Sequence, residues 1–326
     1  RDFKGWISAR TALGASLNVP AVRVGAMVGP DALFARLNAL GLALPESGGF
    51  YGYSLALGSA DVTLAQLTNA YRVLANQGRF GPLRWRDAAA TAASHQVADP
   101  AAVHLVADIL SDNQARVRTF GLDSSLATRG FAAVKTGTSK DMRDNWCIGF
   151  TDRYTVGVWV GNASGQPMHD VSGVSGAAPI WQTVVSHLHQ RRVSMPPALA
   201  PGVVATQVRF DGGAEPARRE VFLAGTEQPV VRAGAQMHAG QPFGITSPRD
   251  GSVFAIDPDM PPTAQRIRFE GAHGVWTLDG KRFAKGSELW WSPWPGRHQL
   301  AWTGNDGTTQ TVRFEVRGAG VKTAKK

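Results

Sequence analysis

The sequence predicts an α+β domain that is followed by a small all-β sandwich. Its first part is rich in Ala and Leu and shows apolar residues at helical spacing, then three short apolar runs of strand length, then one more helical pattern. Its last part turns to Gly, Pro, Trp and β-branched residues, with Asp-Gly pairs that are typical of hairpins. Helices on either side of a group of strands, rather than alternating with them, indicate an antiparallel sheet covered by helices.

Two helices are expected before the strands. The first follows Gly29-Pro30-Asp31, ends at Gly41, and is marked by Leu33, Phe34, Leu37 and Leu40. The second opens at Thr63, because Thr63 and Gln66 fit a capping box, and ends at Gly78. Its apolar positions are Leu64, Leu67, Tyr71 and Leu74.

Three strands are expected next, over residues 131–138, 146–150 and 155–160. Residues 178–189 then read as an amphipathic helix, with one apolar face made of Ile180, Trp181, Val184, Val185 and Leu188.

The domain boundaries are expected at the Pro-rich segments near Pro196-Pro197 and Pro201-Gly202. We expect one domain over residues 1–192, a connector over 193–244 that includes a hairpin, a β-sandwich over 245–317 and a basic tail over 318–326. Asp-Gly turns punctuate the chain beyond the linker, at Asp211-Gly212, Asp250-Gly251, Asp279-Gly280 and Asp306-Gly307.

Composition excludes several classes of function. The net charge is +9, but the basic residues are scattered apart from the tail, which favours a basic surface over a nucleic-acid site and leaves contact with the cell wall or an anionic membrane open. No apolar run is long enough to span a bilayer. The single Cys147 lies in an apolar run and is expected to be a buried structural thiol rather than a nucleophile.

The most informative motif is Lys135-Thr136-Gly137-Thr138 at the end of an apolar strand. Gly137 would let a ligand lie against the strand edge, while Lys135 adds positive charge there. Thr136 and Thr138 offer hydroxyls suited to a carboxylate, and the Thr138 amide could face a developing oxyanion. The alternative is a strand that ends in an exposed turn.

A second short motif, Ser16-Leu17-Asn18, lies upstream of the first. Ser-x-x-Lys, a Ser-x-Asn element and Lys-Thr-Gly together characterise penicillin-binding proteins and serine β-lactamases. Alone, Ser-x-Asn is weak, since Asn18 could simply cap the helix that begins near Pro20.

The surroundings of both motifs resemble class A penicillin-binding proteins. The resemblance runs in order along nearly the whole chain, through residues 5–22, 53–71 and 134–139. Residues 245–316 resemble the C-terminal β module of penicillin-binding protein 1C-type enzymes, on the segments Pro248-Arg249-Asp250-Gly251, Trp276-Thr277-Leu278-Asp279-Gly280 and Pro295-Gly296-Arg297-His298.

This resemblance implies a penicillin-binding and serine β-lactamase-like transpeptidase fold, incomplete at its N-terminus, that crosslinks peptidoglycan stem peptides through an acyl-serine. It implies that Ser16 and Lys135 share a proton-transfer network and that Asn18 binds the substrate's amide. Thr136 and Thr138 would hold the terminal carboxylate. It further implies β-lactam binding, an upstream glycosyltransferase domain and membrane anchor, and a place at the periplasmic face of the inner membrane.

One departure from the family pattern is large, because no serine in the sequence has a lysine three positions later. We therefore expect the nucleophile and its lysine to lie upstream of Arg1, without which this fragment is inactive. A pseudoenzyme, a wall-binding scaffold module and a serine β-lactamase remain as alternatives.

The last part of the chain raises two further questions. Trp290, Trp291 and Trp294 could form a platform for a sugar or a protein, although core packing is the favoured interpretation. Alternation along a strand predicts that Trp290 and Trp291 face opposite sides. Asp250, Asp257 and Asp259 are interpreted as turn residues rather than calcium ligands. We expect no metal and no organic cofactor, since no dinucleotide, P-loop or zinc motif is present.

Overall fold

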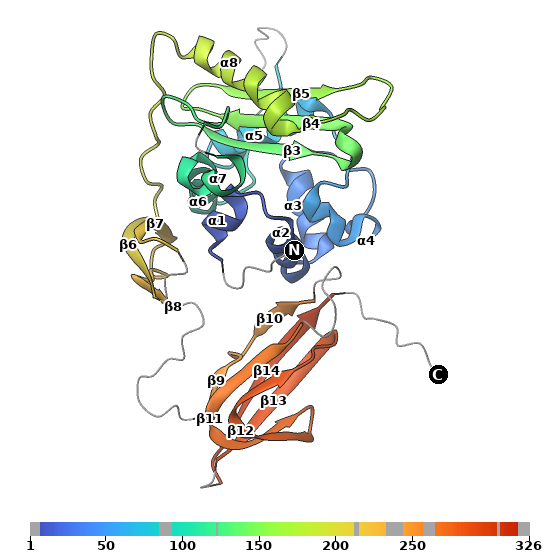
Figure 1. Ribbon diagram of the computed structural model, residues 1–326, viewed down its shortest axis with the longest axis vertical. Coiled ribbons are helices and arrows are strands. Elements are labelled where there is room, and N and C mark those ends of the chain that lie inside the picture. The colour runs from blue at the N-terminus through green and yellow to red at the C-terminus, as the bar shows by residue number, and fades with distance from the viewer. Residues whose placement is uncertain are drawn as a thin grey trace. The chain divides into compact units, whose positions relative to one another are not determined.

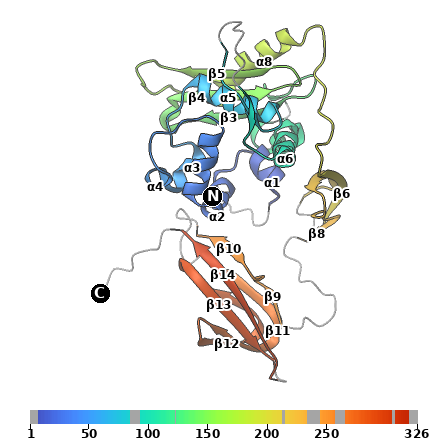
Figure 2. The same cartoon turned by 180° about the vertical axis from the view of Figure 1, so that it is seen from behind.

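The computed structural model describes residues 7–84, 93–121, 123–211, 215–232, 244–256, 265–304 and 307–318. The chain divides into two compact units (Figures 1 and 2). The first unit comprises residues 1–17, 34–47 and 60–235, and the second comprises residues 18–33, 48–59 and 236–326. Helix α3 (Pro30–Ala39) crosses the boundary between these ranges. Within the described residues, no helix is both long and apolar enough to cross a membrane.

The helices of the first unit begin where their capping residues predict. Helix α5 (Leu64–Ala75) opens with the expected capping box, in which the Gln66 amide donates to Thr63 Oγ1 at 3.1 Å and the Thr63 amide donates to Gln66 Oε1 at 3.0 Å. Asp99 caps α6 (Pro100–Ser111) and Asp112 caps α7 (Asn113–Phe120), each through a carboxylate that accepts two backbone amides of the first turn. The unit also contains α1 (Ala9–Gly14) and α8 (Ala178–Leu188).

A three-stranded antiparallel sheet forms the centre of the first unit. Its order is β3 (Ala133–Thr138), β4 (Asp144–Phe150) and β5 (Thr155–Gly161), which confirms the three predicted strands. Helices α5 and α6 pack on one face and α8 packs on the other (Figure 1). Helix α8 buries only Trp181 and Val185 of its predicted apolar face, because Ile180, Val184 and Leu188 lie on the side turned away from the sheet.

The expected connector contains a small sheet of order β7-β6-β8, built from β6 (Val203–Asp211), β7 (Arg218–Leu223) and β8 (Val230–Arg232). Strands β6 and β7 form the antiparallel pair, and Val203 and Val221 pack against Ala101 of α6. A short hairpin of β1 (Arg79–Phe80) and β2 (His95–Gln96) follows α5.

The second unit combines short helices with the C-terminal strands. The helical segments are α2 (Asn18–Val28), α4 (Gly48–Tyr51) and η1 (Gly52–Leu57). The strands are β9 (Ile245–Ser247), β10 (Ser252–Ala255), β11 (Ile267–Leu278), β12 (Lys281–Trp291), β13 (Gly296–Thr303) and β14 (Thr309–Arg317).

These strands form one hydrogen-bonded sheet, where the sequence led us to expect a sandwich of two sheets. The order is β10-β14-β13-β11-β12, with β9 also paired to β11 and with β10 parallel to β14. The long strand β11 accounts for the difference. It pairs with β9 near Glu270 and with β13 from Val275 onward, with register shifts between, so that one sheet bends around its own core.

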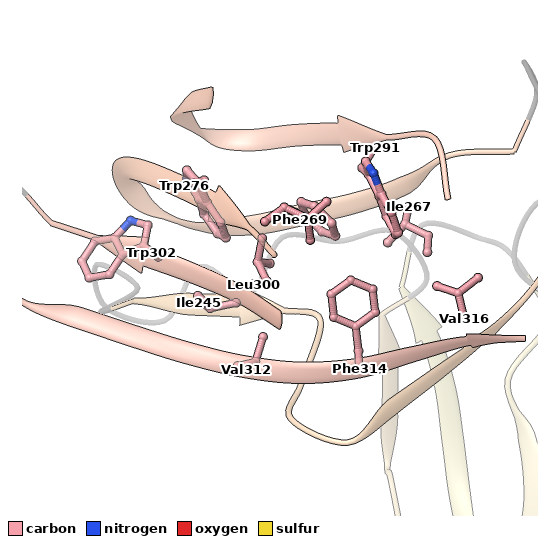
Figure 3. Close-up of a cluster of buried hydrophobic side chains, with 11 residues drawn as sticks. Ile245, Ile267, Phe269, Trp276, Trp291, Leu300, Trp302, Val312, Phe314 and Val316 are labelled. Carbon is pink, nitrogen blue, oxygen red and sulfur yellow. The ribbon is translucent and has the colours of Figure 1, made fainter. Parts of the chain in front are cut away.

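The core of this sheet is aromatic. Figure 3 shows Phe269, Trp276 and Trp291 turned toward Leu300 and Phe314 on the neighbouring strands, and all five are buried. The predicted Asp279-Gly280 turn joins β11 to β12. Gly212, Asp306 and residues 319–326 of the tail lie outside the described residues.

Candidate active site

The first unit brings Ser16 of the second motif to Lys135 of the first motif. Lys135, on β3, donates a hydrogen bond from Nζ to Ser16 Oγ at 2.6 Å, although the two residues lie 119 positions apart. A second bond runs from Lys135 Nζ to the Thr136 carbonyl at 2.8 Å. Ser16 follows α1 with a φ of 56°, a left-handed conformation that is uncommon for serine. Thr119 fixes the preceding residue by donating to the Ala15 carbonyl at 2.8 Å.

Burial makes the Lys135 ammonium a stronger acid than an exposed lysine. Desolvation lowers the pKa of its amine to about 8, and the nearby Arg116 guanidinium acts in the same direction. Arg116 is itself buried, donates to the Leu110 and Leu126 carbonyls, and has its pKa lowered to about 10 by burial. A lysine with a pKa near neutrality can exchange protons with a hydroxyl partner such as Ser16.

The threonines of the motif lie on the other side of β3. The Gly173 amide donates to Thr138 Oγ1 at 3.0 Å, which leaves the hydroxyl proton of Thr138 for another acceptor. A methyl group on Gly173 would lie 2.5 Å from the Gly137 carbonyl oxygen and 3.2 Å from Thr136 Cβ, so only glycine fits there. The turn Gly173–Ala177 thereby holds the end of β3 in place.

Strand β3 is an edge strand among the described residues, with β4 on one side only. A methyl group on Gly137 would meet only the Trp146 side chain, at an ordinary 3.6 Å, so the protein does not itself require glycine here. Space and unpaired backbone at such an edge suit an extended ligand that adds as a further strand.

A buried ionic network anchors the helix that leads to Ser16. Arg10, on α1, is 5% exposed and forms ion pairs with Asp108, Asp112 and Glu220. The Glu215 carboxylate accepts from Ser8 Oγ at 2.8 Å and from Thr11 Oγ1 at 2.9 Å. Burial opposes the charge on Glu220, but its hydrogen bonds to Arg10 outweigh burial and lower its pKa.

The remaining predicted site residue, Asn18, is the first residue of α2 and is counted with the second unit. The first unit therefore brings together Ser16 and Lys135–Thr138 only. Sequence reasoning missed Gly173, Arg116 and Arg10. A glycine-rich stretch around Gly173 was the one available signal, since neither arginine lies near a motif in the sequence.

Several other sequence interpretations can be compared with the structure. Cys147 is fully buried, as predicted, and burial raises the pKa of its thiol to about 12. Asp250 accepts the Arg313 amide in a turn, whereas Asp257 and Asp259 lie outside the described residues. In the part of the chain that the structure describes, no three His, Cys, Asp or Glu side chains form a metal-binding group.

The tryptophan platform, which the sequence analysis gives as the alternative to core packing, is divided in the structure. Trp291 is 3% exposed and belongs to the core, whereas Trp290 on the opposite face is 53% exposed, which confirms the alternation. The Arg268 guanidinium lies 5.8 Å from the Trp290 ring centroid. Trp294 is exposed but packs edge-on against Trp291. The three rings therefore present no common surface.

Comparison with known proteins finds similarity to penicillin-binding proteins. Residues 232–314 match the Penicillin-Binding Protein C-terminus Family. Penicillin-binding protein 1C of Escherichia coli is 33% identical over 207 residues, which are 63% of this chain and 26% of the relative. Penicillin-binding protein 1B of Vibrio cholerae is 27% identical over 206 residues, which are 60% of this chain and 26% of the relative.

The fold has a counterpart among solved structures. The crystal structure of penicillin-binding protein 1A from Haemophilus influenzae superimposes with a TM-score of 0.57 at 21% identity, covering 68% of this chain and 40% of that one. The fold is thus of the α+β class seen in penicillin-binding proteins. More particularly, the chain resembles the C-terminal part of class A penicillin-binding proteins of the 1C type, as its sequence predicted. It spans about a quarter of the length of these curated relatives.

Proposed function

We propose that this chain supplies part of the catalytic site of a peptidoglycan D,D-transpeptidase that works through an acyl-serine. The observation that carries the proposal is the 2.6 Å hydrogen bond from Lys135 Nζ to Ser16 Oγ at the edge strand β3. It joins a hydroxyl to an amine whose pKa is lowered to about 8, which is the chemistry that a proton-transfer pair needs.

Each motif residue has a role in this proposal. Ser16 and Lys135 move the proton of the reacting serine, and the charge of Lys135 favours the anionic transition state. Thr136 and Thr138 bind the terminal carboxylate of a stem peptide laid along β3, and the Thr138 amide faces the oxyanion. Asn18 binds the peptide amide of the substrate. The serine nucleophile and its lysine come from a Ser-x-x-Lys segment outside the given sequence.

The cellular setting belongs to the same proposal. The expected domains over residues 1–192, 193–244 and 245–317 belong to a longer bifunctional enzyme that also carries a glycosyltransferase domain. Its ligands are peptidoglycan stem peptides and β-lactams. It acts at the periplasmic face of the inner membrane, through an anchor that the given sequence does not contain.

The test is covalent labelling of the protein expressed from its complete gene with a fluorescent penicillin. The wild-type protein is expected to form an adduct that survives denaturing gel electrophoresis. Lys135→Ala is expected to lower the rate of adduct formation by about 10²–10³-fold, the usual loss of one group that stabilises transition-state charge.

The matched control is Lys140→Ala, which removes an exposed lysine five positions further along. It is expected to label at nearly the wild-type rate. An adduct that hydrolyses within minutes would instead indicate a β-lactamase. The absence of any adduct in the wild-type protein would indicate a non-catalytic wall-binding module.

A further inference from the structure

The C-terminal sheet carries a cavity of about 470 Å³ that lies outside the candidate active site. Its floor is formed by Arg297–Gln299 on β13 and Arg313–Glu315 on β14, and its walls by residues 251–253 and Asp279. All of these residues belong to the second unit.

The cavity opens on the outward face of the sheet. His298 and Phe314 are buried, and Phe314 belongs to the aromatic core that Figure 3 shows on the inner side. Because side chains alternate along a strand, the residues that project outward over the floor are Arg297, Gln299, Arg313 and Glu315. The register pairs Arg297 with Glu315 and Gln299 with Arg313, so the two arginines are diagonal neighbours on adjacent strands.

The acidic residues of the cavity already have partners. The two oxygens of Glu315 accept from Arg317 Nε at 2.9 Å and from Arg317 Nη2 at 3.2 Å. Asp279 accepts from the Gln299 amide and contacts His298 Nδ1, each at 2.8 Å. Within the described residues, by contrast, the guanidinium groups of Arg297 and Arg313 form neither a hydrogen bond nor an ion pair.

We propose that this cavity binds an acidic peptide through Arg297 and Arg313. Diagonal positions on neighbouring strands lie about 7–8 Å apart, which suits two separate carboxylates better than one small anion. Each guanidinium can take a carboxylate through two parallel hydrogen bonds. Gln299, which lies opposite Arg313 and two residues along β13 from Arg297, offers its side-chain amide to a peptide group. The ligand class, a stem peptide with free carboxylates, rests on the function proposed above.

The experiment is calorimetric titration of the 326-residue chain at low salt with a purified muropeptide that has free carboxylates. The double variant Arg297→Gln/Arg313→Gln is expected to weaken binding at least tenfold, since two charge-assisted contacts are lost. The control Lys281→Gln/Arg282→Gln removes the same charge from exposed positions of β12, and binding is expected to stay within twofold. Near-UV circular dichroism of the buried tryptophans verifies that each variant is folded.

Three results would overturn the proposal: no binding by the wild-type chain at millimolar muropeptide, an equal loss in both double variants, or equal affinity for an amidated muropeptide. Displacement of the muropeptide by an equal concentration of inorganic pyrophosphate would reassign the cavity to phosphate ligands. Penicillin labelling of Arg297→Gln/Arg313→Gln in the complete protein is expected to be unchanged. The cavity and the transpeptidase site can therefore fail independently.

Discussion

The sheet β3-β4-β5 and the C-terminal sheet differ in the side chains that they bury. Around β3 and β4 the interior holds ionisable groups, namely Lys135, Arg116, Cys147 and the anchoring Arg10. The C-terminal sheet encloses mainly aromatic and aliphatic side chains around Phe269 and Trp276, with His298 as a buried ionisable group, and most of its charges face outward. Burying ionisable groups costs stability and alters their pKa values, so it is tolerated mainly where chemistry needs it. The contrast supports the two proposals made above, a catalytic site on the first sheet and a surface-binding cavity on the second.

The largest expected effect that sharpens this comparison comes from Arg10→Ala. It leaves Asp108 and Glu220 without their buried partner, and we expect the first unit to lose about 3–5 kcal/mol of unfolding free energy. Urea denaturation followed by circular dichroism measures the loss. Arg209→Ala, which removes an arginine that is 73% exposed, is the control and is expected to change stability by less than about 1 kcal/mol.

The stability lost in Arg10→Ala is also expected to depend on pH. Because Arg10 lowers the pKa of Glu220 below the usual value for a glutamate, the pair stabilises the wild-type fold above that usual value. The stabilisation is lost as the pH falls through the lowered pKa. The difference in stability between wild type and Arg10→Ala should therefore narrow in acid. An unchanged difference at pH 3 would show that Arg10 acts through packing alone.

A smaller effect is expected from Gly173→Ala. The added methyl group would collide with the Gly137 carbonyl oxygen and displace the end of β3, at a cost of about 1–3 kcal/mol. If the whole cost falls on the reacting geometry, penicillin labelling of the complete protein should fall by roughly 5- to 150-fold. Gly286→Ala makes the same change in the C-terminal sheet, where the nearest contact would be an ordinary 3.4 Å. Equal labelling rates for Gly173→Ala and Gly286→Ala would show that Gly173 does not position the site.

The smallest effect concerns the charge of Lys135. Because the pKa of Lys135 is about 8, half of the molecules carry a neutral Lys135 at pH 8 and about nine-tenths do at pH 9. A labelling rate that depends on the ammonium should therefore fall about twofold at pH 8 and about tenfold at pH 9. Lys135→Arg keeps its charge at these pH values, so its labelling rate should not show this decline. A wild-type rate that stays constant to pH 10 would contradict a role for the protonated amine.

Sequence patterns were sufficient for the elements whose signal is local. The capping box at Thr63 and the apolar runs of β3, β4 and β5 depend on near neighbours in the chain, and each was located to within a few residues. The single bent sheet was not foreseen, because the pairing of β11 with β9 on one part and β13 on another depends on long-range register. Periodicity shows which side of a strand is buried, but it does not show which strands close around the core.

The candidate site shows the same limit. The Lys135 motif was visible because its residues are consecutive, and the Ser16 motif because a family pattern of known order could be sought. The contact between Gly173 and Thr138 joins positions 35 residues apart and involves a backbone amide, which leaves no trace in residue type beyond a glycine. Arg116 and Arg10 looked like ordinary surface cations, since burial of a charge cannot be read from the sequence.

The bond between Arg10 and Glu220 also bears on how the protein is made. Its partners lie 210 residues apart, near opposite ends of the first unit. At ribosomal speeds of about 5–20 residues per second, Glu220 is synthesised roughly 10–40 s after Arg10. During that interval the helix that positions Ser16 carries a cation with an incomplete set of partners. The pairing of α1 with the connector strand β7 is therefore a late event in the synthesis of this unit.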